Sequence, residues 1–283
     1  MSNIEGKRGR VSRDYARAVK RATGSGCCCG KPAPKGVVAK LAGYSDEEVA
    51  SLPPEAVVNS FGCGNPLAFS EVGPGEVVLD LGSGAGIDLL LAAKKVGRSG
   101  RVIGVDMTAE MLAQAQENVR AAGVDNVELR QGLIEDLPVA DEAVDWVISN
   151  CVINLSPEKP KVFKEIARVL RPGGRMLVSD IVAEDLPPEV ADNPHLHSSC
   201  LAGAIPEQAY LQGLREAGLV DVRVVDRLVY DADQIRLFIG SELPEEGGCC
   251  GIPSPELAAL ARRVAPQLEG KVASVKVAAR KPA

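Results

Sequence analysis

The chain has 283 residues, 46% of them apolar, and a formal net charge of −6 at pH 7, which suits one large or two modest domains with an ample core. The acidic balance, with no long basic run after residue 21, argues against a nucleic-acid partner, and no apolar stretch reaches the about 18 residues that a membrane span needs. The basic N-terminus lacks the apolar core of a signal peptide, so we expect a cytosolic protein whose eight cysteines stay reduced.

The N-terminal part combines a basic helix with a cluster of thiols. Residues 7–22 have helical composition and carry seven Lys or Arg against a single acid, Asp14. Such a helix could cover an anionic partner, although a solvated charged face explains the composition more simply. A run of three cysteines at positions 27–29 follows, and a further thiol, Cys63, precedes the first predicted strand.

The stretch VVLDLGSGAGIDLLLA predicts a strand, a glycine turn and a helix. Residues 77–81 are almost continuously apolar, as in a buried parallel strand, and only Asp80 interrupts them. Gly82, Gly84 and Gly86 then allow a tight turn and the close approach of a ligand. The spacing G-x-G-x-G differs from the G-x-G-x-x-G dinucleotide fingerprint, which favours a mononucleoside ligand over NAD.

A second strand, residues 101–105, ends in Asp106, twenty residues after Gly86. A carboxylate in this place can hold two ribose hydroxyls. The acid and the glycine turn together are a strong signal for a nucleotide-binding βαβ unit.

Strands and helices continue to alternate as far as Val182, which predicts an α/β fold with a doubly wound, mostly parallel, seven-stranded sheet. After it, residues 183–205 break the rhythm and read as an inserted loop and helix over the carboxyl edge of the sheet. The alternating residues 271–279 are expected to pair at the sheet's edge. The other expected strands are residues 126–130, 143–149, 175–182 and 220–225, and helices are expected at 108–121, 157–169, 206–217 and 255–264.

Ligands of open parallel sheets lie beyond the carboxyl ends of the strands, so residues just after each strand are candidates for binding. Met107 and Ile134 could sandwich a flat base, although ordinary core packing explains them as well. Glu135 could accept a hydrogen bond from an exocyclic amine. Cys151, beside Asn150 after the fourth strand, is well placed to hold the group that receives whatever the ligand donates.

Three motifs that contain cysteine resemble those of the arsenite methyltransferases. They are FGCGNP at residues 61–66, SNCVINLSPEK at 149–159 and CLAGAI at 200–205. LDLGSGAGID and the DMT after the second strand also occur as in that family, and RVLRPGGR is shared more widely with S-adenosylmethionine (SAM) methyltransferases. The resemblance runs from about Tyr15 to the C-terminal RKP.

The resemblance implies the Rossmann-like fold of class I SAM methyltransferases and arsenite as the substrate. It divides the chain into an N-terminal helical segment over the cofactor (1–72), a SAM-binding core (73–182), an arsenite-binding region (183–245) and a C-terminal segment with an edge strand (246–283). Trivalent arsenic would bind Cys63, Cys151 and Cys200, and Tyr15 would close over the cofactor. The implied cofactor residues are Tyr15, Asp80, Gly82, Ser83, Gly84, Gly86, Asp106, Met107, Ile134, Glu135 and Asn150.

The chemistry of arsenic suits these residues. Arsenic(III) is soft and selects thiolates, as soft metals do. Three thiolates leave its lone pair able to attack the methyl carbon of a sulfonium. In the family a further cysteine takes part in redox cycling, and either Cys28 or Cys29 occupies that place, with Cys27 also open. Thioredoxin or glutathione would reset the resulting disulfide.

Other interpretations stay open. The protein could be a SAM methyltransferase of a small organic acceptor, or a metalloid-binding protein without turnover. His195, His197 and Cys200 have spacing that suits a transition metal, but they supply too few ligands for a closed zinc site. Cys249 and Cys250 resemble a pair seen in many family members and could equally be dispensable, and nothing demands more than a monomer.

Overall fold

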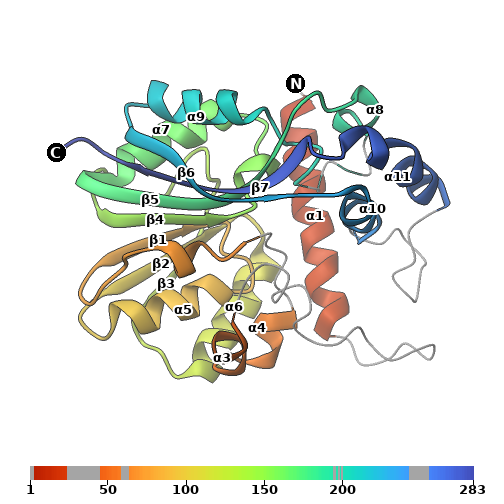
Figure 1. The fold of residues 1–283 in the computed structure, drawn as a ribbon. Coiled ribbons are helices and arrows are strands. Elements are labelled where there is room, and N and C mark those ends of the chain that lie inside the picture. Colours follow the sequence, from red (N-terminus) through yellow and green to blue (C-terminus); the bar gives the residue numbers. More distant parts are fainter. Residues whose placement is uncertain are drawn as a thin grey trace.

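The fold is built around one seven-stranded sheet with helices on both faces (Figure 1). The computed structural model describes residues 3–23, 45–58, 64–193, 196, 198, 200–241 and 255–283. The strand order is β3-β2-β1-β4-β5-β7-β6, and β1 to β5 run parallel to one another. This confirms the predicted doubly wound α/β fold.

The strands fall close to their predicted positions. They are β1 (Val77–Leu81), β2 (Arg101–Asp106), β3 (Val127–Gln131), β4 (Val144–Asn150), β5 (Leu170–Ala183), β6 (Val220–Val229) and β7 (Val272–Arg280). The helices of the described residues are α1 (Asn3–Thr23), α3 (Asp46–Ala50), α4 (Pro54–Val58), α5 (Ile87–Val96), α6 (Ala109–Ala122), α7 (Lys159–Val169), α8 (Pro188–Ala191), α9 (Glu207–Glu216), α10 (Ala232–Ser241) and α11 (Pro255–Leu268).

The prediction of an edge strand near the C-terminus is wrong. β7 pairs antiparallel with β5 on one side and with β6 on the other, so β6 is the edge strand. Val275 and Val277 of β7 are completely buried, whereas Leu228 and Val229 of β6 are exposed. Alternation in a sequence shows which side chains face the core, but it does not show whether a strand has neighbours on one side or on both.

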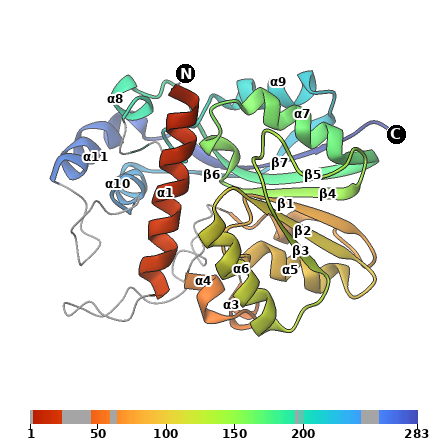
Figure 2. The same ribbon diagram turned by 180° about the vertical axis from the view of Figure 1, so that it is seen from behind.

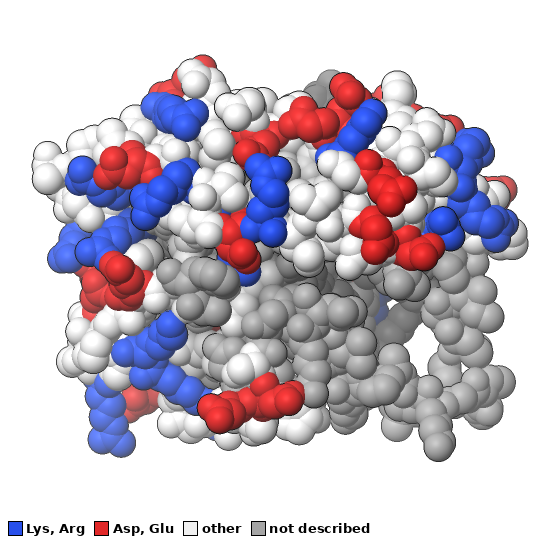
Figure 3. All heavy atoms as spheres, in the orientation of Figure 1, with Lys and Arg blue, Asp and Glu red and all other residues white. Residues whose placement is uncertain are grey.

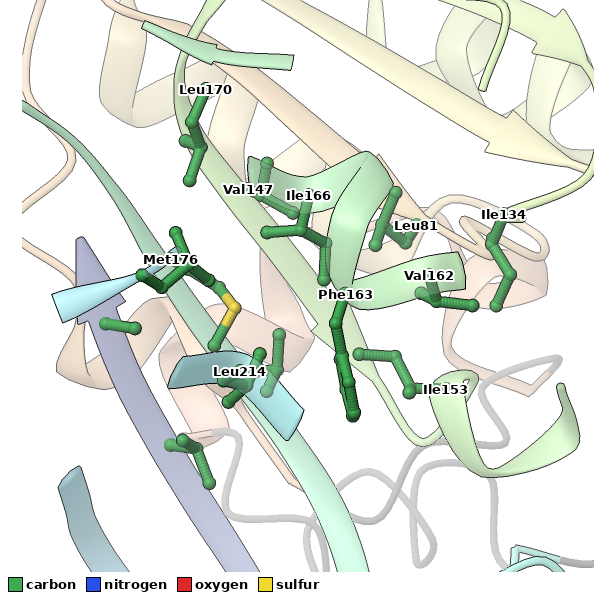
Figure 4. Packing of buried hydrophobic residues seen from close by; sticks show 14 of the residues in the cluster. Leu81, Ile134, Val147, Ile153, Val162, Phe163, Ile166, Leu170, Met176 and Leu214 are labelled. Carbon is green, nitrogen blue, oxygen red and sulfur yellow. The ribbon is translucent and has the colours of Figure 1, made fainter. Parts of the chain in front are cut away.

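Helices α5 and α6 cover one face of the parallel strands, and α7 and α9 cover the other (Figures 1 and 2). In the core under α7, Phe163 and Ile166 pack with Leu81 and Val147 of the sheet (Figure 4). The Phe163 ring meets Tyr210 of α9 edge to face, with 5.2 Å between ring centroids. Burying each such side chain stabilises the fold by about 1.5–3 kcal/mol, which holds the strand ends in fixed positions.

A third group of apolar residues lies beyond this sheet core. Ile235 and Ile239 of α10 pack with Leu260 of α11 in the same cluster as Cys151 and Cys200. The sequence analysis did not predict α10. Helix α1 runs between the α10–α11 pair and α6 (Figure 2).

On the face shown in Figure 3, basic and acidic side chains lie interspersed among uncharged ones. Ion pairs between elements include Arg227 with Glu207 and Lys276 with Asp226. None of the helices in the described part of the chain is long and apolar enough to cross a membrane.

Candidate active site

A pocket opens at the carboxyl ends of the parallel strands, where open α/β sheets bind their ligands. Of the predicted cofactor residues, all but Gly86 line it. Gly86 instead precedes the first turn of α5 as its N-cap residue, with a φ of 92°. Those that line the pocket are Tyr15, Asp80, Gly82, Ser83, Gly84, Asp106, Met107, Ile134, Glu135 and Asn150.

Two glycines of the turn after β1 are required for different reasons. A Cβ atom at Gly82 would lie 2.2 Å from Cγ2 of Val152, so no side chain fits there. At Gly84 no atom lies within 4 Å of a Cβ, but its φ of +52° is a conformation that L side chains rarely adopt. The Gly84 N–H donates to Oδ2 of Asp106 at 3.0 Å, which ties the turn to the end of β2.

Asp106 is held by the backbone around it. Its Oδ1 accepts from the N–H of Thr108 at 2.8 Å, in addition to the bond from Gly84 to Oδ2. Burial raises the pKa of Asp106, while the hydrogen bonds from Thr108 and Gly84 oppose the rise. The carboxylate is thus fixed at the pocket wall, where the sequence predicts that it binds the hydroxyls of a ribose.

The pocket wall also contains two polar groups, Asp80 and Ser83, that are buried at a cost in free energy. Burial raises the pKa of Asp80 well above its ordinary range, and the nearby charges of Asp88 and Asp106 raise it further. The hydroxyl of Ser83 is buried in the same wall, and within the described residues it has no hydrogen-bond partner. A ligand with positive charge and a polar group would relieve both costs. The pocket therefore fits a nucleoside that carries a cationic group, as SAM does.

Helix α1 closes one side of the pocket. It contributes Arg8, Val11 and Tyr15, which the helical repeat places on one face. The guanidinium of Arg8 lies 3.0 Å from Oε1 of Glu135 and 2.6 Å from Oε2 of Glu158. Tyr15 was predicted from the sequence and Arg8 was not, although the spacing of seven residues between them places both on one helix face.

The same helix contacts the loop before Cys200. Oγ of Ser198 donates to Oδ2 of Asp14 at 2.6 Å, and the Tyr15 hydroxyl donates to the Ser198 carbonyl oxygen at 3.4 Å. Helix α1 therefore connects the pocket with the cysteine loop.

We expect Arg8→Met to increase the dissociation rate of SAM about fivefold, because the helix would lose an ion pair worth about 1 kcal/mol that holds it over the pocket. Stopped-flow measurement of SAM release checks this. Arg13→Met, at an exposed position of the same helix, should leave the rate unchanged. Equal rates for Arg8→Met and the unmodified chain would mean that α1 does not retain the cofactor.

Cys151 stands directly after β4, in the wall of the same pocket. Its φ of 60° is left-handed, a conformation that residues other than glycine seldom adopt and that is often found at functional sites. Its N–H donates to the Ser179 carbonyl oxygen at 2.8 Å, which fixes the turn against β5. Cys151 is 3% exposed and disulfide-bonded, so the expectation that all eight cysteines stay reduced is wrong for this structure.

Cys200 meets Cys151 although 49 residues separate them. The Cys200 thiol lies 2.9 Å from the carbonyl oxygen of Cys151 and is buried. Two of the three predicted arsenic-binding cysteines are therefore adjacent, at the side of the pocket where β4 ends.

The other predicted thiols lie outside the described residues. They are Cys27, Cys28, Cys29, Cys63, Cys249 and Cys250, and His195 and His197 lie outside as well. Gly64, which follows Cys63 in sequence, is described, and its N–H donates to Oδ1 of Asn150 at 3.1 Å. Among the residues that the structure describes, no three His, Cys, Asp or Glu side chains are grouped so as to hold a metal ion.

Two interacting ionisable groups, Lys159 and Asp180, lie near this loop and were not identified from the sequence. Burial lowers the pKa of Lys159 to about 8, against the opposing charges of Asp180 and Cys200. Burial raises the pKa of Asp180 to about 7, against the charge of Lys159. The hydroxyl of Tyr210 donates to Oδ2 of Asp180 at 3.3 Å.

The raised pKa of Asp180 predicts a specific pH dependence of stability. Between pH 4 and 7 the folded protein keeps a proton that an unfolded Asp, with its ordinary pKa of 3.8, has lost, so this group's contribution to stability falls as pH rises through that window. Asp180→Asn should therefore flatten the decline. Urea unfolding of both proteins from pH 4.5 to 7.5 measures it, with Asp125→Asn at an exposed position as control. An unchanged slope in Asp180→Asn would contradict the assignment.

Comparison with known proteins shows that this chain is similar to methyltransferases. A family model described as "Methyltransferase domain" matches residues 73–218. The chain is 48% identical over 206 residues to an arsenite methyltransferase of Halobacterium salinarum, which covers 72% of this chain and 52% of the relative. The arsenite methyltransferase of Homo sapiens is 34% identical over 205 residues, covering 68% of this chain and 52% of the relative.

A solved structure extends the similarity to most of the fold. The arsenic(III) S-adenosylmethionine methyltransferase from Chlamydomonas reinhardtii superimposes with a TM-score of 0.61 at 34% identity, covering 89% of this chain and 75% of that one. The chain spans about half the length of the curated relatives it matches.

Proposed function

Because the chain belongs to the arsenite methyltransferase family of SAM-dependent methyltransferases, we propose that it transfers a methyl group from SAM to trivalent arsenic. One observation carries this proposal. Cys151 lines the same pocket as the glycine turn and Asp106, and the Cys200 thiol is adjacent to Cys151. Two cysteines at and beside the wall of a nucleoside pocket, once reduced, suit a thiophilic acceptor better than an organic one.

The thiols of Cys63, Cys151 and Cys200 bind the substrate. Arsenous acid exchanges its three hydroxyl groups for three thiolates, and each displaced hydroxyl leaves as water with a thiol proton, so no separate base is needed. The three sulfurs hold arsenic with its lone pair directed away from them. The burial of Cys151 and Cys200 excludes water from this site.

The cofactor residues hold SAM at the carboxyl ends of β1 and β2. Asp106 binds the ribose, Met107 and Ile134 flank the base, and the acidic group around Asp80 attracts positive charge. When bound, SAM supplies an electrophilic methyl group. The chain contributes position, and positioning of reactants accounts for up to about 7–11 kcal/mol of a barrier.

Methyl transfer raises the formal oxidation state of arsenic from III to V, so return to arsenic(III) needs two electrons. Two thiols that form a disulfide provide them, and Cys28 or Cys29 is the proposed partner of an arsenic-binding cysteine. A thiol reductant, thioredoxin or glutathione, then reduces the disulfide. The disulfide at Cys151 supports this cycle, because Cys151 has to be reduced before it binds arsenic.

The proposed setting follows from this chemistry. A cytosolic location keeps the thiols reduced. Activity as a monomer is part of the proposal. The first 72 residues would cover the cofactor, since α1 lines the pocket, and residues 183–245 would contribute to the arsenite site through Cys200.

The test is to incubate the reduced protein with arsenite, SAM and thioredoxin or glutathione, and to measure methylated arsenicals and S-adenosylhomocysteine by mass spectrometry. Methylated arsenic with matching S-adenosylhomocysteine supports the proposal. Tight arsenite binding without S-adenosylhomocysteine would identify a metalloid-binding protein instead. Absence of both would favour a methyltransferase of an organic acceptor.

A further inference from the structure

Three cysteines that lie 88 and 49 residues apart in sequence have to meet at one point, so other residues must hold their segments together. The motif SNCVINLS supplies two asparagines around Cys151, one immediately before it and one three residues after it. The side chains of both make hydrogen bonds to the backbone of the other cysteine segments.

Asn150 contacts the segment that contains Cys63. Its Oδ1 accepts from the N–H of Gly64 at 3.1 Å, and its Nδ2 donates to the carbonyl oxygen of Gly64 at 2.5 Å. Nδ2 also lies 3.3 Å from Oδ2 of Asp88. The amide thus pairs with both backbone groups of the residue that follows Cys63.

Asn154 contacts the segment of Cys200. Its Nδ2 donates to the Cys200 carbonyl oxygen at 3.1 Å and to the Ile181 carbonyl oxygen at 2.6 Å, which uses both amide hydrogens. Its Oδ1 is buried and, among the described residues, has no partner. A buried acceptor without a partner is unfavourable, and both donors nevertheless stay on these carbonyls.

Close packing confines the same two segments. A Cβ at Gly64 would lie 1.9 Å from Oγ of Ser179, the residue whose carbonyl binds the Cys151 N–H. A Cβ at Gly203 would lie 1.9 Å from the carbonyl oxygen of Asn154. At Gly64 and Gly203 the backbone therefore lies too close to the residues around Cys151 to leave room for a side chain.

The backbone of Asn154 is itself held by Lys159 and Asp180. Nζ of Lys159 donates to the Asn154 carbonyl oxygen at 3.2 Å, and the N–H of Asn154 donates to the carboxylate of Asp180. Since both of its backbone groups are held, its side chain has little freedom to move away from Cys200.

We infer that Asn150 and Asn154 are positioning residues for the thiol site: Asn150 sets the Cys63 segment against Cys151, and Asn154 sets Cys200 against Cys151. The inference rests on the proposed function for its purpose. It also gives Asn150 a role beyond the predicted contact with SAM.

The separate roles of Asn150 and Asn154 can be tested with a probe that binds only two thiols. Phenylarsine oxide binds two thiolates, and its affinity is measured without SAM. The full chain would carry serine at positions 27, 28, 29, 249 and 250, so that other vicinal thiols do not compete. Cys200→Ser then leaves Cys63 with Cys151, and Cys63→Ser leaves Cys151 with Cys200.

Each asparagine variant should weaken phenylarsine oxide binding to only one of the two pairs of cysteines. With Cys63 and Cys151 present, Asn150→Ala should weaken phenylarsine oxide binding about tenfold and Asn154→Ala less than about twofold, as loss of about 1.4 kcal/mol of positioning predicts. With Cys151 and Cys200 present, the order should reverse. Gly203→Ala should mimic Asn154→Ala, since it pushes the Cys200 loop away by another route.

Asn126→Ala is the matched control. Its Nδ2 also donates to two backbone carbonyls, those of Ala93 and Gly97, far from the cysteines. It should lower the melting temperature without altering affinity in either pair. Equal effects of both asparagine variants on both pairs, or no effect on either, would overturn the inference.

Failure of the proposed function gives a different result. If the crossed pattern holds but arsenite is not methylated, the positioning role stands and the proposed reaction falls. If arsenite is methylated without the crossed pattern, only the positioning role falls.

Discussion

Replacing Cys200 with serine is expected to lower the rate of arsenite methylation about 100-fold or more, while the affinity for SAM stays the same. A serine hydroxyl is nearly isosteric and can still donate to the Cys151 carbonyl oxygen, so the loop should keep its place. It is a hard, protonated ligand, however, and arsenic(III) prefers soft thiolates. Arsenic held by two sulfurs would lose its fixed position relative to the methyl group.

Initial rates of methylated arsenic formation and equilibrium titration with SAM separate these effects. Cys200 is not one of the described residues that line the cofactor pocket. SAM binding therefore serves as the internal control. Ser198→Ala, two residues earlier in the same loop, tests whether any change in this loop is enough to lower the methylation rate. A Cys200→Ser protein that methylates arsenite at the unmodified rate would contradict a three-thiol site.

Gly82→Ala is expected to weaken SAM binding by more than about tenfold and to reduce arsenical binding as well. The new Cβ would lie 2.2 Å from Cγ2 and 2.7 Å from Cβ of Val152, so either the glycine turn or Val152 has to move. Because Val152 follows Cys151 directly, a shift of that residue reaches the thiol site. One methyl group should thus damage both halves of the active site.

The control for Gly82→Ala is Gly97→Ala. Both glycines have a φ of +63°, which L side chains rarely adopt, so both substitutions strain the backbone, at a cost of about 1–3 kcal/mol. At Gly97 nothing lies within 4 Å of the added Cβ. Thermal unfolding should show a loss of stability for both proteins, and SAM titration should show a defect only for Gly82→Ala. A SAM affinity that falls equally in both would mean that strain, not the clash, is responsible.

The cofactor half of the site could be predicted from the sequence because its signals are local. The strand, the glycines and Asp106 lie within thirty residues of each other, and the turn geometry depends on residue type alone. Gly86 shows the limit of this reasoning. It belongs to the same motif, yet it caps α5 and does not line the pocket.

Features that depend on distant contacts were not predictable in the same way. The position of β7 depends on pairing with two strands that lie far away in sequence. Arg8 gains its role from Glu135, 127 residues later. Asn154 and Lys159 read as ordinary polar residues until the fold brings them to Cys200 and Asp180. The resemblance identified the cysteines, but not what holds them together.

The interior place of β7 affects how the chain acquires its structure during synthesis. The parallel strands β1 to β4 leave the ribosome early and can pair as soon as they emerge, whereas β5 has an open backbone edge until β7 is made about 90 residues later. A chain cut before Val272 would lose the strand that joins β5 to β6 and would leave both available for aggregation. Nascent chains stalled in that interval should therefore depend on chaperones more strongly than either shorter or finished ones.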